Sequence, residues 1–208
     1  MKKIRLNVAC GGRPLKGYIN IDMDSLSKLK KRYPNKNFSK DLLLKNWNVF
    51  KLPLKDNSVD EINSDAFIEH LSFVEEHKFF KEMIRVMKPG GKITLSTTDF
   101  EKIVKIWLKL KDNWLDFYRV DNKAIKEKHW FGTYTYDYKN RWGYIIASIF
   151  GSQNGDGQYH KNCYTKKKLI SICKFFNLKV ILTKNYKWQG NRDPMIKIIA
   201  KKNIKFKS

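Results

Sequence analysis

A turn of two glycines near the start of the chain, Cys10-Gly11-Gly12, directly follows the strand-like run Leu6–Ala9. In such a turn, glycine leaves the backbone N–H groups open to close approach by a polar or anionic ligand. Asp22 ends the next β-rich run, where a carboxylate can accept two hydrogen bonds from ribose hydroxyls. The turn is a weak signal alone, but together with Asp22 it predicts a cofactor site at the carboxyl ends of these strands.

Two further carboxylates and a histidine fall at the same predicted sheet edge. Asp41 follows a short β-like run, Lys36–Ser39, within reach of an adenine amino group. Glu69 and His70 come just beyond the run Ser58–Ser64, and ligands of open α/β sheets bind outside the carboxyl ends of the strands. We therefore expect Asp41 and Glu69 to belong to the cofactor site.

The elements that must position these residues form a parallel sheet flanked by helices, because short β-rich runs alternate with helical patterns over the first hundred or so residues. The clearest helix is Phe73–Met87, whose apolar residues recur at spacings of three and four. Ser72 and Glu75 give a capping-box pattern at its start, and Lys88-Pro89-Gly90-Gly91 ends it. A further strand, Lys92–Thr98, follows.

The second half of the chain differs in character. Residues 100–162 are rich in Trp, Tyr, Lys and Asn, and they predict a helical and aromatic insertion near the site. Helical periodicity returns at Thr165–Phe176, where the first residue can act as N-cap. Two final runs, Leu178–Lys187 and Met195–Lys201, predict an antiparallel pair of strands.

These motifs resemble the class I S-adenosylmethionine-dependent methyltransferases, and within them a small group of predicted methyltransferases similar to methyltransferase-11-like domains. The matching stretches are Leu6–Gly12, Gly17–Asp22, Leu52–Ile62, Phe67–Leu71 and Glu82–Lys92. The resemblance implies a Rossmann-like α/β fold with a mostly parallel seven-stranded sheet and an antiparallel last strand. It also implies a single domain over 1–208: a cofactor-binding half (1–99), an acceptor-side insertion (100–162), and a C-terminal helix and strand pair (163–208).

The resemblance further implies S-adenosylmethionine as the cofactor. It places Gly11 under the methionine end, Asp22 on the ribose and Asp41 at the adenine. The link from the glycine turn to Asp22 is too short for a full helix, so a loop or a single turn is expected there. This short link argues against a nicotinamide dinucleotide fold, in which the acidic residue follows the glycines by about 20 residues.

Four neighbours of Gly11 in the first motif, Asn7, Ala9, Cys10 and Gly12, are expected to take part in cofactor binding. Two of them depart from the family pattern, because Asn7 stands where the family usually has an acidic residue and Ala9 stands for the first loop glycine. Asn7 can still donate and accept hydrogen bonds, but it cannot pair ionically with the ammonium group of the cofactor.

Methyl transfer to a hydroxyl needs a group that removes a proton, and His70 is the best-placed general base, with His160 and Asp99 as further candidates. Each has a structural alternative: His70 packs on the cofactor, Asp99 caps the next helix, and His160 is a loop residue without a special role. The four histidines lack paired ligand spacing and the three cysteines form no CxxC pair, so no metal site is expected.

A net charge of +23 raises nucleic-acid binding as an alternative, but the lysines are spread along the whole chain rather than clustered. The favoured function is O-methylation of a small molecule or sugar. RNA methylation and a non-catalytic cofactor- or RNA-binding module are the alternatives. No apolar run approaches the roughly 18–20 residues that cross a bilayer, so a cytoplasmic protein without a membrane span is expected.

Overall fold

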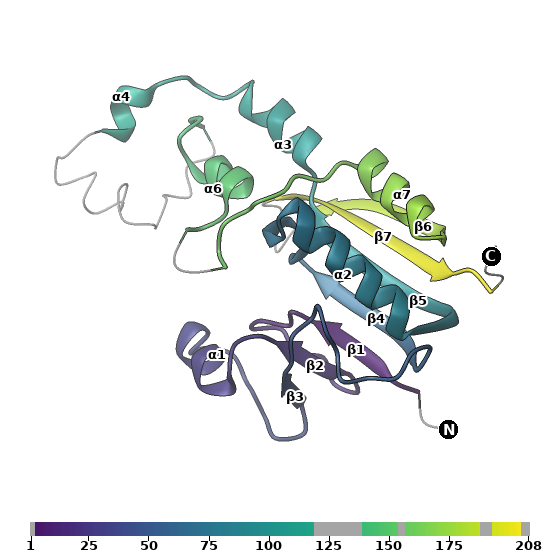
Figure 1. The fold of residues 1–208 in the computed structure, drawn as a ribbon. Helices are drawn as coiled ribbons and strands as arrows, with labels where there is room; N and C mark the ends of the chain where they lie inside the picture. Colours follow the sequence, from purple (N-terminus) through teal and green to yellow (C-terminus); the bar gives the residue numbers. More distant parts are fainter. Residues whose placement is uncertain (1–2, 119–138, 154–156, 188–192, 205–208) are drawn as a thin grey trace.

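A seven-stranded sheet forms the centre of the computed structural model, which describes residues 3–118, 139–153, 157–187 and 193–204 (Figure 1). The strands in chain order are β1 (Arg5–Val8), β2 (Ile19–Asp22), β3 (Leu43–Asn46), β4 (Val59–Asp65), β5 (Met87–Thr98), β6 (Leu178–Lys187) and β7 (Pro194–Lys202). Their order across the sheet is β3-β2-β1-β4-β5-β7-β6. The first five strands pair in parallel, whereas β7 is antiparallel to both β5 and β6, which confirms the expected fold.

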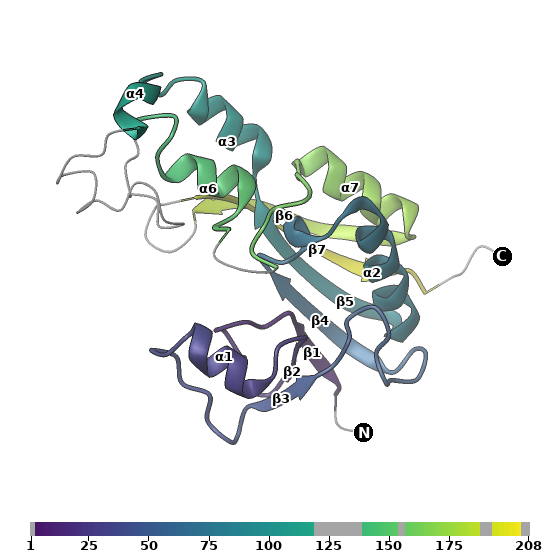
Figure 2. The same ribbon diagram turned by 60° about the vertical axis from the view of Figure 1, so that its left-hand side comes forward.

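The described helices lie on one face of the sheet and beyond its carboxyl edge. They are α1 (Leu26–Arg32), the 3-10 turn η1 (Ile68–His70), α2 (Phe73–Val86), α3 (Phe100–Trp107), α4 (Trp114–Phe117), α6 (Tyr144–Phe150) and α7 (Lys166–Phe175). Helices α2 and α7 cover the same face of the sheet, and α3, α4 and α6 gather beyond the end of β5 (Figures 1 and 2). None of the helices in this described part is both long and apolar enough to span a membrane.

Helix α2 forms as its sequence predicts. The Ser72 hydroxyl accepts from the Glu75 N–H, and the Glu75 carboxylate accepts from the Ser72 N–H, so both halves of the capping box are present. Its buried face, including Phe79, Phe80 and Met83, packs into the main hydrophobic core. Each such side chain stabilises the fold by about 1.5–3 kcal/mol on burial.

The link between β1 and β2 contains no helix, as its length predicts. Two other expectations need correction. The third strand is Leu43–Asn46 rather than Lys36–Ser39, so Asp41 precedes this strand instead of following it. Lys88–Gly91 also lies within β5: Val59 pairs with Met87 and Glu61 with Lys92, so the glycines form an irregular bulge rather than a turn before the strand.

The predicted antiparallel pair of final strands and the Thr165 cap of α7 are present. Of the predicted insertion over 100–162, residues 119–138 lie outside the described part of the chain. Helices α3, α4 and α6 belong to the rest of it.

Candidate active site

One cavity of about 790 Å³ opens at the carboxyl edge of the sheet. Its lining comes from the loops after β1, β2, β3 and β4, from the end of α1, from α6, and from the loop that precedes α7. The parallel strands explain this location, because their carboxyl ends bring loops from distant parts of the sequence to one edge. A volume of this size holds a drug-sized or nucleoside-sized ligand.

The glycine turn after β1 is held by the carboxylate that ends β2. The Gly11 N–H donates to Asp22 Oδ2 at 2.8 Å, and the Asp24 N–H donates to Oδ1 at 2.9 Å. Ala9 and Gly11 both have positive φ angles, 52° and 49°, so the turn uses backbone conformations that favour glycine. The glycine turn and Asp22 thus lie together, and Ala9, Cys10, Gly11, Gly12 and Asp22 all line the cavity.

Cys10 is nearly buried, and its N–H donates to the Ile21 carbonyl, which ties the turn to β2. Burial, with a smaller contribution from the charge of Asp22, raises the pKa of the Cys10 thiol to about 12. A thiol that stays protonated at neutral pH is a poor nucleophile, so we assign Cys10 a structural role in the turn.

Asn7 does not line the cavity. Asn7 is 3% exposed, and its side-chain NH₂ donates to the Arg13 carbonyl at 3.0 Å and to Asn20 Oδ1 at 2.8 Å. The side-chain NH₂ of Asn63 donates to Asn7 Oδ1. Asn20 in turn accepts from the Leu15 N–H. These amides hold the loop that replaces the missing helix between β1 and β2. Asn7 is thus placed to position the glycine turn through these hydrogen bonds. The network was not foreseen, because the pairing of Asn7 with Asn20 and Asn63 depends on the register of three strands.

Asp41 is exposed, accepts a hydrogen bond from Ser39, and does not line the cavity. The expectation that it follows the third strand failed because the strand begins two residues after it. The residues that reach the cavity here come from the loop after β3, which supplies Val49 and Phe50, and from Met23 after β2. Their apolar side chains form the surface on which a flat ring can pack.

The ring of Tyr33, at the end of α1, lies on the glycine turn and lines the cavity. A Cβ added at Gly12 would stand 2.8 Å from Tyr33 Cγ, which is closer than real Cβ atoms come. Glycine is therefore required at position 12 for close approach of this ring. Nothing in the spacing of Tyr33 indicated this contact, because it depends on how α1 folds back over the turn.

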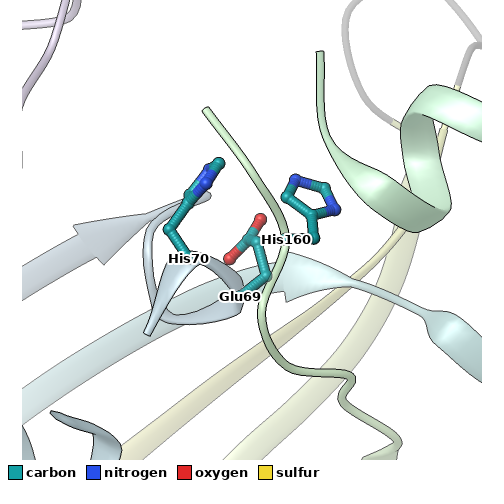
Figure 3. A group of neighbouring side chains, drawn as sticks. All are labelled: Glu69, His70 and His160. Atoms are coloured by element: carbon teal, nitrogen blue, oxygen red, sulfur yellow. The ribbon is translucent and has the colours of Figure 1, made fainter. Parts of the chain in front are cut away.

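Three predicted site residues that line the same cavity come together: Glu69, His70 and His160 (Figure 3). The rings of His70 and His160 meet edge to face with centroids 4.8 Å apart. The loop that carries His160 is held against η1, because the N–H groups of Lys161 and Asn162 both donate to the Glu69 carbonyl. Residues about 90 positions apart in sequence are thereby fixed in one site.

Both imidazoles are oriented by backbone carbonyls. His70 Nδ1 lies 3.0 Å from the Tyr159 carbonyl oxygen, and His160 Nδ1 lies 3.1 Å from that of Ser148. A carbonyl oxygen only accepts, so each Nδ1 carries the proton and each Nε2 keeps its lone pair. Burial lowers the pKa of His70, and burial together with the neighbouring His70 lowers that of His160 to about 4, so both rings are neutral at pH 7.

Glu69 is 1% exposed, and the Thr97 hydroxyl donates to its Oε2 at 2.9 Å. Burial raises the pKa of this carboxyl to about 7. None of the ion pairs among the described residues includes Glu69. Thr97, which is fully buried on β5, was not singled out in the sequence.

Asp99 stands apart from this group. Its carboxylate caps α3 by accepting from the Lys102 N–H and also accepts from the Asn185 amide. It does not line the cavity. The geometry matches its structural alternative as a helix cap.

Six acidic and four basic residues line the cavity, in contrast to the strongly basic chain as a whole. Three of the basic ones are paired with lining acids: Arg13 with Asp65, Arg32 with Asp24, and Lys161 with Glu75. The excess positive charge of the protein is therefore not gathered at this cavity in the described part of the chain.

Comparison with known proteins agrees with this geometry. Residues 9–95 match a family model described as a methyltransferase domain. A SAM-dependent methyltransferase of Methanosarcina mazei is similar in structure, with a TM-score of 0.56, 19% identity, and coverage of 99% of this chain and 95% of its own. An S-adenosylmethionine-dependent methyltransferase of Mesorhizobium loti is also similar, with a TM-score of 0.54 and 11% identity. The alignment covers 96% of this chain and 91% of the Mesorhizobium loti chain.

A third structure, the 1,6-didemethyltoxoflavin-N1-methyltransferase of Burkholderia thailandensis with bound 1,6-didemethyltoxoflavin and S-adenosylhomocysteine, gives a TM-score of 0.54 at 9% identity. The alignment covers 96% of this chain and 71% of that one. No match was found among curated proteins. The fold is that of S-adenosylmethionine-dependent methyltransferases, and residues 9–95 match the methyltransferase-domain model.

Proposed function

We propose that the protein uses S-adenosylmethionine to methylate an oxygen atom of a small molecule or saccharide. The observation that carries the proposal is one continuous cavity that joins the glycine turn and Asp22 to the imidazoles of His70 and His160. The cofactor end and the proton-accepting end thus share one space. The S-adenosylhomocysteine bound to the Burkholderia relative supports the same cofactor here.

The residues at the first end fit this cofactor. Each carboxylate oxygen of Asp22 has more than one acceptor position, so Asp22 can accept ribose hydroxyls while it holds the N–H groups of Gly11 and Asp24. Met23 and Phe50 offer apolar surface for the adenine ring. The acidic lining also favours a cofactor that bears a positive sulfonium.

The bound cofactor supplies an activated methyl group on a positively charged sulfur. The protein then has to align the acceptor oxygen, exclude water and take up a proton. Nε2 of His70 or His160 is neutral, and this atom can accept the hydroxyl proton. Asp99 is engaged as the cap of α3, so we assign the proton transfer to the histidines.

We also propose that the chain forms one domain with three parts. Residues 1–99 provide the cofactor end, and residues 100–162 provide the acceptor side, because α6 and its following loop bring Ser148 and His160 to the cavity. Residues 163–208 complete the sheet with α7, β6 and β7.

RNA methylation is the alternative suggested by the +23 charge. The ion pairs of Arg13, Arg32 and Lys161 with lining acids argue against it, because paired cations release fewer counterions to phosphate. A small or sugar-like acceptor fits the cavity better.

Methyl-labelled S-adenosylmethionine incubated with purified protein and cell extract tests the proposal. The label is expected in the low-molecular-weight or saccharide fraction, to resist ribonuclease, and to be lost with Asp22→Asn. Label that ribonuclease releases would favour RNA as the acceptor. Tight cofactor binding without any transfer would favour a non-catalytic module.

A further inference from the structure

We propose that Glu69, His70 and His160 bind a divalent transition-metal ion at the acceptor end of the cavity. One potential ligand atom from each of the three residues lies within 4.8 Å of the other two (Figure 3). The spacing of these residues in the sequence gave no indication of a metal site. The fold creates the cluster by docking the loop before α7 onto η1.

The orientation of the two imidazoles is the second observation. Metal-binding histidines almost always donate their other ring N–H to a carbonyl or a carboxylate, which fixes the ring and its tautomer. His70 and His160 both do this, to the carbonyls of Tyr159 and Ser148. Figure 3 shows one ring nitrogen of His160 turned toward His70 and Glu69. In two rings held in this way, each Nε2 keeps a lone pair that can bind a metal ion.

The third ligand is a buried carboxylate that forms no ion pair with any residue that the structure describes. Glu69 is 1% exposed, and an ionised carboxyl in such a place is costly unless a cation or several donors compensate for its charge. The Thr97 hydroxyl donates to one of its oxygens, as the hydrogen-bonded ligands of metal centres commonly show. A bound dication would supply the missing charge.

The donor set selects the kind of ion. Two imidazoles and one carboxylate suit Zn²⁺, Fe²⁺ or a similar ion, whereas Mg²⁺ and Ca²⁺ prefer oxygen ligands. Metal–ligand bonds of about 2.0–2.2 Å place neighbouring donors about 3.3 Å apart in a tetrahedral site. Since no pair of these ligand atoms is more than 4.8 Å apart, each pair has to close by at most about 1.5 Å when the ion binds, a movement within reach of side-chain rotation.

Three protein ligands leave at least one position open, as in catalytic rather than structural zinc sites. This step rests on the proposed function: the open position would take the hydroxyl oxygen of the methyl acceptor and lower its pKa. The O–H proton then passes to solvent, and an electron pair of the oxygen forms the new O–CH₃ bond. The electron pair of the CH₃–S bond remains on sulfur, which leaves a neutral thioether. The metal would replace a histidine as the means of deprotonation.

Calorimetric titration of Zn²⁺ into chelator-treated protein tests the site, with Mg²⁺ as the comparison ion. We expect one Zn²⁺ per chain and much weaker Mg²⁺ binding. His160→Gln and Glu69→Gln keep size and hydrogen-bonding capacity, and each should weaken Zn²⁺ binding by at least about tenfold. Circular dichroism and the melting temperature confirm that each variant folds.

Two control variants separate this site from adventitious binding. His77→Ala removes a histidine that packs against Phe175 and Phe176 outside the cavity, and Cys163→Ser removes an exposed thiol. Both controls should bind Zn²⁺ as the wild type does. Absence of stoichiometric Zn²⁺ binding, or an equal loss in His77→Ala and His160→Gln, would overturn the metal site.

Measurement of S-adenosylhomocysteine binding on the same proteins keeps the two proposals distinguishable. His160→Gln should bind it within about threefold of the wild type, because His160 contacts His70 and the Ser148 carbonyl rather than the glycine turn or Asp22. Methyl transfer by a protein that binds no Zn²⁺ and is insensitive to chelator would sink the metal site and leave the proposed function standing. Stoichiometric Zn²⁺ binding without methyl transfer would refute the proposed function and leave the metal site standing.

Discussion

Replacement of Asp22 by asparagine tests the centre of the cofactor assignment. The Asp22 carboxylate accepts from two backbone N–H groups, at 2.8 Å from Gly11 and 2.9 Å from Asp24. Asparagine has nearly the same shape, but one of its two terminal atoms is an NH₂ that cannot accept. One of these bonds is therefore lost, and the negative charge that strengthens the other disappears.

In the proposed complex the ribose hydroxyls donate to this same carboxylate, and the expected magnitude follows from the loss of one such bond to a charged acceptor. A hydrogen bond to a charged group contributes about 1.5–3 kcal/mol, and each 1.4 kcal/mol is tenfold in affinity. The Kd for S-adenosylhomocysteine should therefore rise by about 10- to 150-fold in Asp22→Asn. Isothermal titration calorimetry measures this Kd directly, and thermal melting shows whether the variant remains folded.

Asp41→Asn is the matched control. The same change is made at a carboxylate that is exposed, lies two residues before β3 and does not line the cavity. Binding should stay within about twofold of the wild type, because nothing near the ligand changes. Unchanged binding in Asp22→Asn, or an equal loss in both variants, would refute the placement of the ribose at Asp22.

Three further predictions concern packing, backbone and thiols. Phe80→Ala, at a fully buried site, should lower the free energy of unfolding in urea by about 3–5 kcal/mol, whereas Phe175→Ala, 74% exposed, should change it by about 0.5 kcal/mol or less. Gly151→Ala would place a Cβ 2.0 Å from the Gln158 carbonyl oxygen, and it should lower the melting temperature more than Gly157→Ala, which has a similar positive φ but open space. An equal fall in melting temperature in both variants would show that the positive φ, rather than the clash with Gln158, causes the destabilisation. At pH 8 only Cys163, which is exposed, should react quickly with Ellman's reagent. Burial raises the pKa of Cys10 to about 12 and that of Cys173 to about 11, so both of these thiols stay protonated. Cys163→Ser should remove the fast phase, and urea should make the remaining thiols reactive.

The fold was predictable where a capping pattern within a few residues coincides with an apolar pattern long enough for a helix. The capping box at Ser72 and the Thr165 cap are encoded within a few residues, and the structure contains both. The predicted apolar stripe of α2 was only partly right: Phe80 is buried, but Phe73 is 73% exposed, and the buried face is completed by Phe79, Met83 and Val86. The third strand was misplaced because Leu43–Asn46 is a short edge strand with mostly exposed side chains, so its burial pattern shows no alternation. Periodicity cannot locate a strand that buries so little.

The cofactor end of the site was predictable because it depends on strand ends, which the order of the sequence fixes. Asp22 met the glycine turn once β1 and β2 paired in parallel. The role of Asn7 was not predictable, because a buried amide network needs the partners Asn20 and Asn63 on neighbouring strands. The residue type indicated that Asn7 could form hydrogen bonds, but the sequence did not show which way its side chain would point from the sheet.

The acceptor end depends on docking between segments that share no local signal. His70 and His160 meet only because the N–H groups of Lys161 and Asn162 donate to the Glu69 carbonyl and because the Tyr164 hydroxyl donates to the Ile68 carbonyl. These bonds are made by the backbone or by a buried ring, so their formation leaves no spacing rule in the sequence. It follows that the proposed acceptor chemistry is coupled to the docking of this loop, whereas the contact of Asp22 with the glycine turn needs only the pairing of β1 with β2. Substitutions that loosen the loop should therefore impair metal binding and methyl transfer while cofactor affinity is retained.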